Sequence, residues 1–292
     1  MISRLLRVTL LLLLGTVLWV PGSTAQEAHH FLMVNPGNEA ATPDRAEDFL
    51  DRMGRYLHDT VPALQNRPVR GWITNRRDSA QARLSRDPVL AFVPPSVYLE
   101  VLHDSERAAT PVAEIPRFGA AAQRYHLVTP NDGPTSLDDL RGGLVRAAEG
   151  ADPTYLSRVA FPSSFQPGPD VTLETAENMN DEVFLLTEGP MGDEQPADAL
   201  LLDADLKHFF ETDDLVWPQL TVIWSSDPLP RDLVVALGPS WTDSDREALK
   251  EALFQMPDHE IGVELLDLMN SSGFVPVDED RLSDVARQYS SQ

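Results

Sequence analysis

Strand and helix patterns alternate along the first part of this 292-residue chain, and their order constrains the fold more than any single motif does. Short apolar runs at 31–34, 69–73 and 89–93 predict strands, and a helical pattern follows each of them. A strand that is repeatedly followed by a helix is typical of a parallel sheet with helices on both faces. The sequence therefore predicts an α/β fold of the doubly wound type.

The helix after the first strand has the clearest pattern. Thr42 is expected to cap it and Pro43 to lie in its first turn, where the missing N–H does no harm. Apolar side chains then recur at helical spacing, and they are Ala46, Phe49, Leu50, Met53, Tyr56 and Leu57. This spacing predicts that one face of the helix packs on a core.

A second series of elements begins near residue 124. Its expected strands are four apolar runs, at 125–128, 144–148, 171–175 and 199–202, and its expected helices lie at 154–159 and 176–187. Ser136 with Asp139, and later Thr242 with Asp245, match capping boxes and predict that helices begin there. The remaining expected elements are the strands 220–224 and 232–237 and the helices 261–269 and 282–289.

Residues 1–25 have the pattern of a cleavable export signal. A basic start is followed by a 13-residue apolar run at 8–20, and Ser23 and Ala25 are the small residues before the expected cleavage site. The run is too short to span a bilayer comfortably. The chain has no cysteine, so neither a disulfide nor a thioether-linked lipid can form. We therefore expect an unanchored protein in a bacterial periplasm.

Composition and motifs exclude several classes of function. The formal net charge of −23 argues against nucleic acid or an anionic membrane surface as a partner, because both require a basic face. The absence of cysteine excludes thiol nucleophiles, thiolate zinc sites and iron–sulfur clusters. No phosphate-binding loop, dinucleotide fingerprint or serine nucleophile elbow occurs, and His259 with Glu260 does not complete a zinc motif. The sequence predicts no catalytic residue, metal or cofactor.

Four stretches, in this order along the chain, carry a resemblance to a known family. They are 31–57, 87–99, the segment from 124 to 142 that includes TSLDDLRG, and ADALLLD at 197–203. Together they resemble the type II periplasmic solute-binding proteins, in particular the phosphate, phosphite and phosphonate group that serves ABC importers. The resemblance implies a binding protein and not an enzyme.

The resemblance also implies an architecture. Two doubly wound α/β lobes would be joined by two crossing strands, at 124–128 and 220–224. The first lobe would combine 26–123 with 220–292, and the second would be 124–219. A small-molecule ligand would bind between the lobes, and an ABC permease in the inner membrane would be the partner. We expect a monomer.

The expected ligand residues follow from the position of the loops. In doubly wound sheets, ligands bind beyond the carboxyl ends of the strands, where side-chain donors surround a small oxyanion. The first-lobe residues at such positions are Asn35, Asn38, Thr74, Asn75, Ser96 and Tyr98. The same residue types are also ordinary components of loops and helix caps, so both interpretations stay open.

The second lobe departs from the family pattern. Phosphonate binders have a turn rich in serine, threonine and glycine after the strand equivalent to 144–148, whereas this chain has Glu149 and Asp152, which would repel a dianion. Ser163 and Ser164 are the alternative donors. Asp203 could meet a ligand amine or cap the following helix. The solute is thus expected to be a phosphonate-like or phosphite-like oxyanion or a related compound, with zwitterionic and cationic solutes as alternatives.

Three functions remain open at this point. The leading one is a periplasmic solute-binding protein for an ABC importer. The second is a ligand-binding module that feeds a membrane sensor. The third is a periplasmic hydrolase, since catalytic residues are recognised in space and not by their order in the chain.

Overall fold

We determined the fold from a computed structural model. It describes residues 27–35, 43–103, 105–117, 120, 122–148, 151–176, 178–189 and 195–291. The expected signal at 1–25 lies outside the described residues, as do Asn38, Thr42 and Glu149. Within the described part of the chain, no helix combines the length and apolar character needed to cross a bilayer.

The first sheet has five strands in the order β2-β1-β3-β10-β4. They are β1 (His29–Val34), β2 (Val69–Thr74), β3 (Leu90–Val93), β4 (Ala109–Ile115) and β10 (Asp232–Leu237). β1 is parallel to β2 and β3, while β10 is antiparallel to β3 and β4. The strands expected at 31–34, 69–73 and 89–93 are confirmed as the parallel part of this sheet.

The second sheet has the order β7-β6-β8-β5-β9. Its strands are β5 (Tyr125–Pro130), β6 (Leu144–Ala148), β7 (Thr172–Ala176), β8 (Ala199–Asp203) and β9 (Leu220–Ser225). β6 is parallel to β7 and β8, and β5 is antiparallel to β8 and β9. The mixed α/β class with two sheets is confirmed.

One boundary differs from the sequence-based division at 219 and 220. β9 pairs with β5 along its length, so residues 220–225 belong to the second sheet. The chain then returns to the first sheet through 226–231, where Gln123 and Leu229 exchange two backbone hydrogen bonds of 3.0 and 2.8 Å. We call each sheet, with the helices that cover it, a lobe; the assignment of the other residues to lobes stays a prediction.

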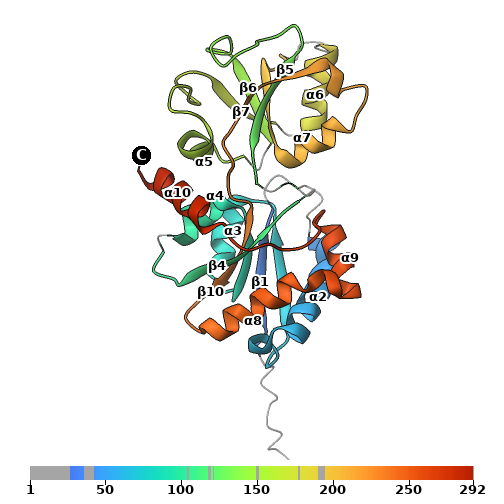
Figure 1. The fold of residues 1–292 in the computed structure, drawn as a ribbon, viewed down its shortest axis with the longest axis vertical. Coiled ribbons are helices and arrows are strands. Elements are labelled where there is room, and N and C mark those ends of the chain that lie inside the picture. Colours follow the sequence, from blue (N-terminus) through green and yellow to red (C-terminus); the bar gives the residue numbers. More distant parts are fainter. Residues whose placement is uncertain are drawn as a thin grey trace, which may run out of the picture.

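Helices cover both faces of each sheet (Figure 1). In the first lobe they are α2 (Pro43–Thr60), α3 (Arg77–Leu84), α4 (Pro95–Val97), α8 (Asp243–Phe254), α9 (Glu260–Leu268) and α10 (Glu279–Ser290). In the second lobe they are α5 (Pro153–Tyr155), α6 (Met179–Glu188) and α7 (Ala204–Glu211). In the described part of the chain there are also short helical turns, namely η1 (Pro62–Leu64), η2 (Tyr98–His103), η3 (Leu156–Ala160), η4 (Trp217–Gln219) and η5 (Met256–Asp258).

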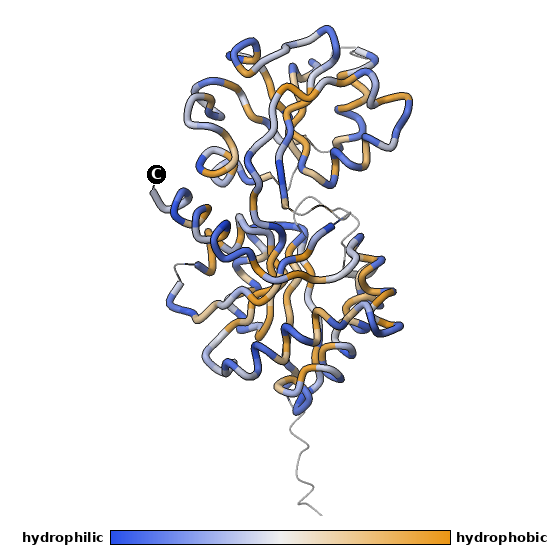
Figure 2. Tube along the Cα trace, in the orientation of Figure 1, coloured by the Kyte–Doolittle hydropathy of each residue, from blue (hydrophilic) through white to orange (hydrophobic). Residues whose placement is uncertain are grey.

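The α2 helix packs on the first sheet with the face that its spacing predicts. Leu50, Met53 and Leu57 are buried in one cluster with residues of α8 and α9. The Tyr56 hydroxyl donates a 2.6 Å hydrogen bond to the Ala252 carbonyl of α8. Apolar segments are concentrated at the centre of each lobe (Figure 2). Burial of this surface is the main force that holds the helices on the sheets.

A single apolar cluster joins the two lobes on one side. It contains Leu102 of η2, Leu156 and Val159 of η3, and Val285 of α10. Figure 1 shows α10 beside α4 of one lobe and α5 of the other. The Arg158 guanidinium donates to the Tyr289 carbonyl at 2.9 Å and lies 5.2 Å from the centre of its ring. This side of the molecule therefore ties the lobes together.

Candidate functional site

A cavity of about 630 Å³ lies between the two sheets. Its lining comes from residues that follow β1, β3 and β4 in the first lobe and from the ends of β6, β7 and β8 in the second. This is the position at which doubly wound folds bind ligands, because loops and helix starts converge beyond the carboxyl ends of the strands. The volume suits a small molecule.

Three of the sequence-predicted site residues line this cavity. Asn35 follows β1, Ser96 lies in α4 directly after β3, and Asp203 ends β8 in the opposite lobe. Ser96 is buried, whereas Asn35 and Asp203 are half-buried. The fold thus brings these three residues from distant parts of the sequence to one cavity. Their contact with a ligand stays a prediction.

The other described candidates lie away from the lining, and they are Thr74, Asn75, Tyr98, Ser163 and Ser164. The Thr74 hydroxyl accepts from the Arg76 backbone at 3.2 Å and so closes its own turn. Tyr98 is buried in the core, with its hydroxyl 3.5 Å from the His103 ring nitrogen. Ser163 and Ser164 are exposed on the surface of the second lobe. A local hydrogen bond thus directs Thr74, and core packing directs Tyr98.

Trp72 and Trp224 could be expected to stack on an organic ligand, but both already stack on protein rings. Trp72 lies 4.2 Å from the His30 ring, and Trp224 lies 5.0 Å from the Phe161 ring. Neither tryptophan lines the cavity.

Asp203 combines the two roles that its sequence position suggests. Its carboxylate accepts a 2.8 Å hydrogen bond from the Leu206 backbone N–H and so caps α7. The same residue lines the cavity. Burial raises the pKa of Asp203, although the capping bond and Arg117 oppose that shift. A positively charged ligand group would offset the free-energy cost of burying the charged carboxylate of Asp203.

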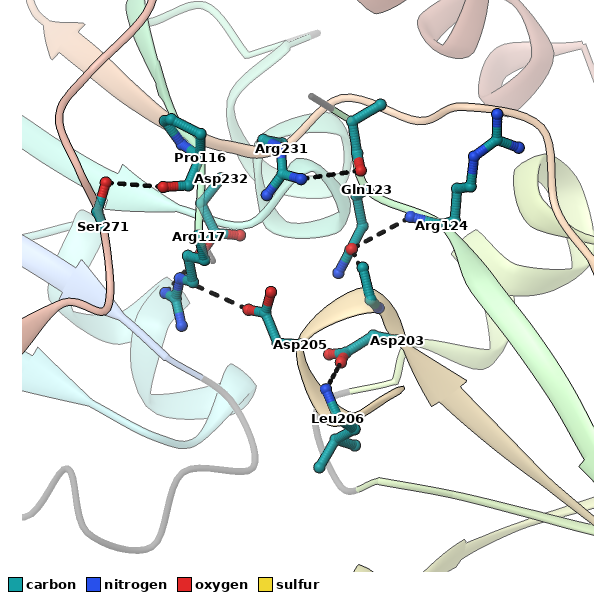
Figure 3. A network of polar contacts seen from close by, with 12 residues as sticks. Pro116, Arg117, Gln123, Arg124, Asp203, Asp205, Leu206, Arg231, Asp232 and Ser271 are labelled. Carbon is teal, nitrogen blue, oxygen red and sulfur yellow. Dashed lines mark hydrogen bonds and ion pairs between the residues drawn. The ribbon is translucent and has the colours of Figure 1, made fainter. Parts of the chain in front are cut away.

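Sequence reasoning missed the charged residues beside Asp203, which Figure 3 shows converging on the cavity. Arg117 pairs with Asp232 at 2.7 Å and approaches Asp205 at 3.9 Å. Burial and the neighbouring Asp203 raise the pKa of Asp205 to about 7. These residues are isolated charges at 117, 205 and 232, so no local motif could have identified them.

Two segments link the sheets, one leading into β5 and the other, 226–231, leading into β10. Gln123 lies in the first linking segment and Arg231 in the second, and both line the cavity (Figure 3). Arg231 is 4 % exposed and donates to the Ala122 carbonyl at 2.9 Å. Burial lowers its pKa. The Gln123 side-chain oxygen accepts from the Arg124 backbone at 3.1 Å and from the Ala204 backbone at 3.3 Å. This glutamine therefore connects the linking segment to the start of α7.

Three buried polar atoms of cavity-lining residues have no hydrogen-bond partner among the described residues. They are Nε of Arg117, Nε of Arg231 and the hydroxyl oxygen of Tyr155. Leaving such an atom buried and unpaired costs about 1–3 kcal/mol. Buried polar atoms are therefore less completely hydrogen-bonded in the cavity wall than in an ordinary protein core.

The charge of the lining favours a cationic group over a dianion. Three carboxylates, of Asp203, Asp205 and Asp232, face two guanidinium groups, of Arg117 and Arg231. Crowded carboxylates repel further negative charge and attract a cation. Among the described residues, no group of three metal-ligating side chains gathers. The arrangement can bind an amine, or a zwitterion that turns its positive end to the aspartates.

A family model and several solved structures match this chain. The model of the family described as ABC transporter, phosphonate, periplasmic substrate-binding protein matches residues 194–282. None of the curated proteins matches the sequence.

Solved structures show the fold. A Xanthomonas citri protein with bound chloride has a TM-score of 0.67 at 15% identity, covering 89% of this chain and 97% of its own. A binding protein component of an ABC phosphonate transporter from Pseudomonas aeruginosa has a TM-score of 0.62 at 13% identity, with 90% and 85% covered. PhnD1 from Prochlorococcus marinus, in complex with methylphosphonate, has a TM-score of 0.60 at 11% identity, with 89% and 96% covered. The shared fold is the type II periplasmic binding fold.

Proposed function

We propose that this chain, a type II periplasmic solute-binding protein of the phosphonate ABC transporter family, captures a small solute between its two lobes and delivers it to an ABC importer. The cavity carries this proposal, because both lobes contribute to its lining. Proteins of this build respond to ligand by hinge closure, and the closed form is what a permease distinguishes. The family binds substrates and is not an enzyme family.

The family is periplasmic, which agrees with the location expected from the sequence. The pattern at 1–25 supports export through a cleavable signal, and the absence of cysteine supports an unanchored form. We propose that the protein acts as a monomer, since one chain supplies both walls of the cavity.

The solute is proposed to carry a positive charge. Asp203 and Asp205 lie on the second-lobe side of the cavity, and burial raises the pKa of both carboxyl groups. A ligand ammonium group would stabilise their charged forms and would gain two partners at once. An aminophosphonate or another small amine-bearing solute therefore fits better than phosphate or phosphite. This narrows the oxyanion class that the family resemblance implies.

A thermal-shift panel followed by calorimetry tests the proposal. The panel contains alkylphosphonates, phosphite, phosphate, sulfonates, aminophosphonates and simple organic amines. A ligand at about 100 times its Kd stabilises the folded state by about 2.7 kcal/mol, which raises the Tm by several degrees. We expect that response from amine-bearing solutes. A flat response across the panel would contradict the solute-binding role.

Substitution of Asp205 tests the placement of the charged group. Asp205→Asn keeps the size of the side chain and removes its charge, so we expect the affinity for an amine-bearing solute to fall by about tenfold or more. Asp243→Asn, on an exposed residue of α8, changes the net charge equally and serves as the control. Equal affinities of the two variants would show that Asp205 does not meet the ligand.

A further inference from the structure

Asp152 is a buried carboxylate next to residues that line the cavity. It is 6 % exposed and lies between Ala151 and Tyr155, both of which line the cavity. One of its carboxylate oxygens accepts a 2.9 Å hydrogen bond from the Thr154 backbone N–H and caps α5. The second lobe itself therefore holds this carboxylate in place.

Arg77 reaches the other carboxylate oxygen from the opposite lobe. It begins α3, which follows β2 of the first sheet, and its guanidinium pairs directly with Asp152. The same guanidinium lies 2.6 Å from the Glu100 carboxylate and 3.5 Å from the carbonyl of Ser96, a residue of the cavity lining. The Arg77–Asp152 pair thus joins the two lobes directly beside residues of the cavity lining.

The three side chains Arg77, Asp152 and Glu100 leave this wall with an excess of negative charge. One guanidinium is shared by two carboxylates, so its capacity to bind an additional anion is already used. An anionic ligand group placed there would meet a carboxylate that is almost fully buried and weakly screened.

We infer that Asp152 determines specificity by supplying, as a permanent part of the protein, the anion that Arg77 would otherwise accept from a ligand. This inference rests on the proposed solute-binding function and deepens it. The cleft accepts solutes that have no dianionic group at this wall, and the contact between the lobes through Arg77 does not depend on ligand charge. Asp152 therefore excludes simple oxyanions, while Asp203 and Asp205 attract a cation.

Replacement of Asp152 by asparagine tests the inference. Asn is as good a helix N-cap as Asp, so Asp152→Asn retains the bond to Thr154 and removes only the charge. Arg77 then has a free position for an anion. We expect the variant to bind methylphosphonate or inorganic phosphate at least about tenfold more tightly than the unchanged protein, by calorimetry at low ionic strength. In Asp152→Asn combined with Arg77→Gln, this gain is expected to disappear.

Asp243→Asn is the matched control, because it raises the net charge equally at a residue that is far from the cavity lining. A similar gain in this control would assign the effect to net charge and would overturn the inference. A folded Asp152→Asn protein without the gain would overturn it as well. Asp152→Ser, which also retains a capping oxygen, is the second variant, and failure of both to fold would give Asp152 a structural role only.

The panel of solutes distinguishes a failure of the inference about Asp152 from a failure of the proposed solute-binding function. If the unchanged protein binds an amine-bearing solute and Asp152→Asn gains no affinity for oxyanions, the inference fails and the proposed function stands. If the unchanged protein binds no solute of the panel, the proposed function fails, whatever the Asp152→Asn variant does.

Discussion

Asp205 shows, at the scale of a single residue, how the cleft modifies side-chain chemistry. Its carboxyl group is buried next to Asp203, and the Arg117 guanidinium at 3.9 Å compensates only in part. The pKa therefore rises from 3.8 to about 7. The folded-state pKa of Asp205 exceeds its unfolded value. The contribution of this group to the free energy of unfolding is therefore fully present below about pH 4 and is lost as the pH rises through 7.

We expect Asp205→Asn to stabilise the ligand-free protein at alkaline pH. An amide has no charge to desolvate, so the variant should gain roughly 1–3 kcal/mol at pH 8, a range reduced for solvent screening. The gain should shrink toward pH 4, where Asp205 is protonated in the folded protein. Urea denaturation at several pH values measures this difference. A gain that is independent of pH, or an equal gain in Asp243→Asn, would contradict the explanation.

At the scale of elements, capping and periodicity predicted some helices well and others poorly. Thr242 and Asp245 form the expected capping box and begin α8. Ser136 and Asp139 also form their hydrogen bonds, with 2.8 Å between their side-chain oxygens, yet the chain makes only a turn there. Gly142 follows with a φ of 79°, and β6 begins two residues later. The chain is too short there for a helix to form before the strand.

The contact between α2 and β2 depends on a glycine in the helix. A Cβ atom at Gly54 would lie 2.5 Å from the Val69 carbonyl oxygen, which belongs to the backbone of β2. Gly54→Ala should therefore force the two elements apart and destabilise the protein by about 1–3 kcal/mol, although alanine favours helices. Asp51→Ala, on the exposed face of the same helix, should be neutral or slightly stabilising. Chemical denaturation of both variants provides the comparison.

At the scale of the whole molecule, the relation between the lobes is set by apolar contacts and by charged pairs. The apolar cluster around α10 joins the lobes on one side. The pairs Arg77–Asp152 and Arg117–Asp205 join them across the cavity wall. Charged pairs that are partly open to water separate more readily than apolar cores, so we expect the hinge motion to break these pairs first.

We expect Arg77→Gln to favour an open arrangement of the lobes. The substitution removes the cation between Asp152 and Glu100 and leaves two carboxylates that repel each other. Small-angle scattering of the ligand-free protein should show a larger radius of gyration than that of the unchanged protein. Arg287→Gln, which breaks an exposed pair with Asp284 on α10, is the control. An unchanged radius in both variants would show that the Arg77 pair does not hold the lobes.

The sequence by itself determined the α/β class, the strands of both sheets except β4, the buried face of α2, and a family resemblance that indicated a cleft. These features follow from periodicity, capping and turn chemistry, which depend on neighbouring residues. It also placed Asn35, Ser96 and Asp203 at strand ends, where the carboxyl edges of parallel strands meet.

Only the tertiary structure decided the charge of the cleft and the sheet to which β9 belongs. Arg117, Asp205 and Asp232 are far apart in the chain, as are Arg77 and Asp152, and they meet because strand order brings their elements to one cavity. Burial then changes their pKa values and pairs their charges, and neither effect has a local signature. Electrostatics at a site depends on distance and solvent access, which a linear pattern does not contain.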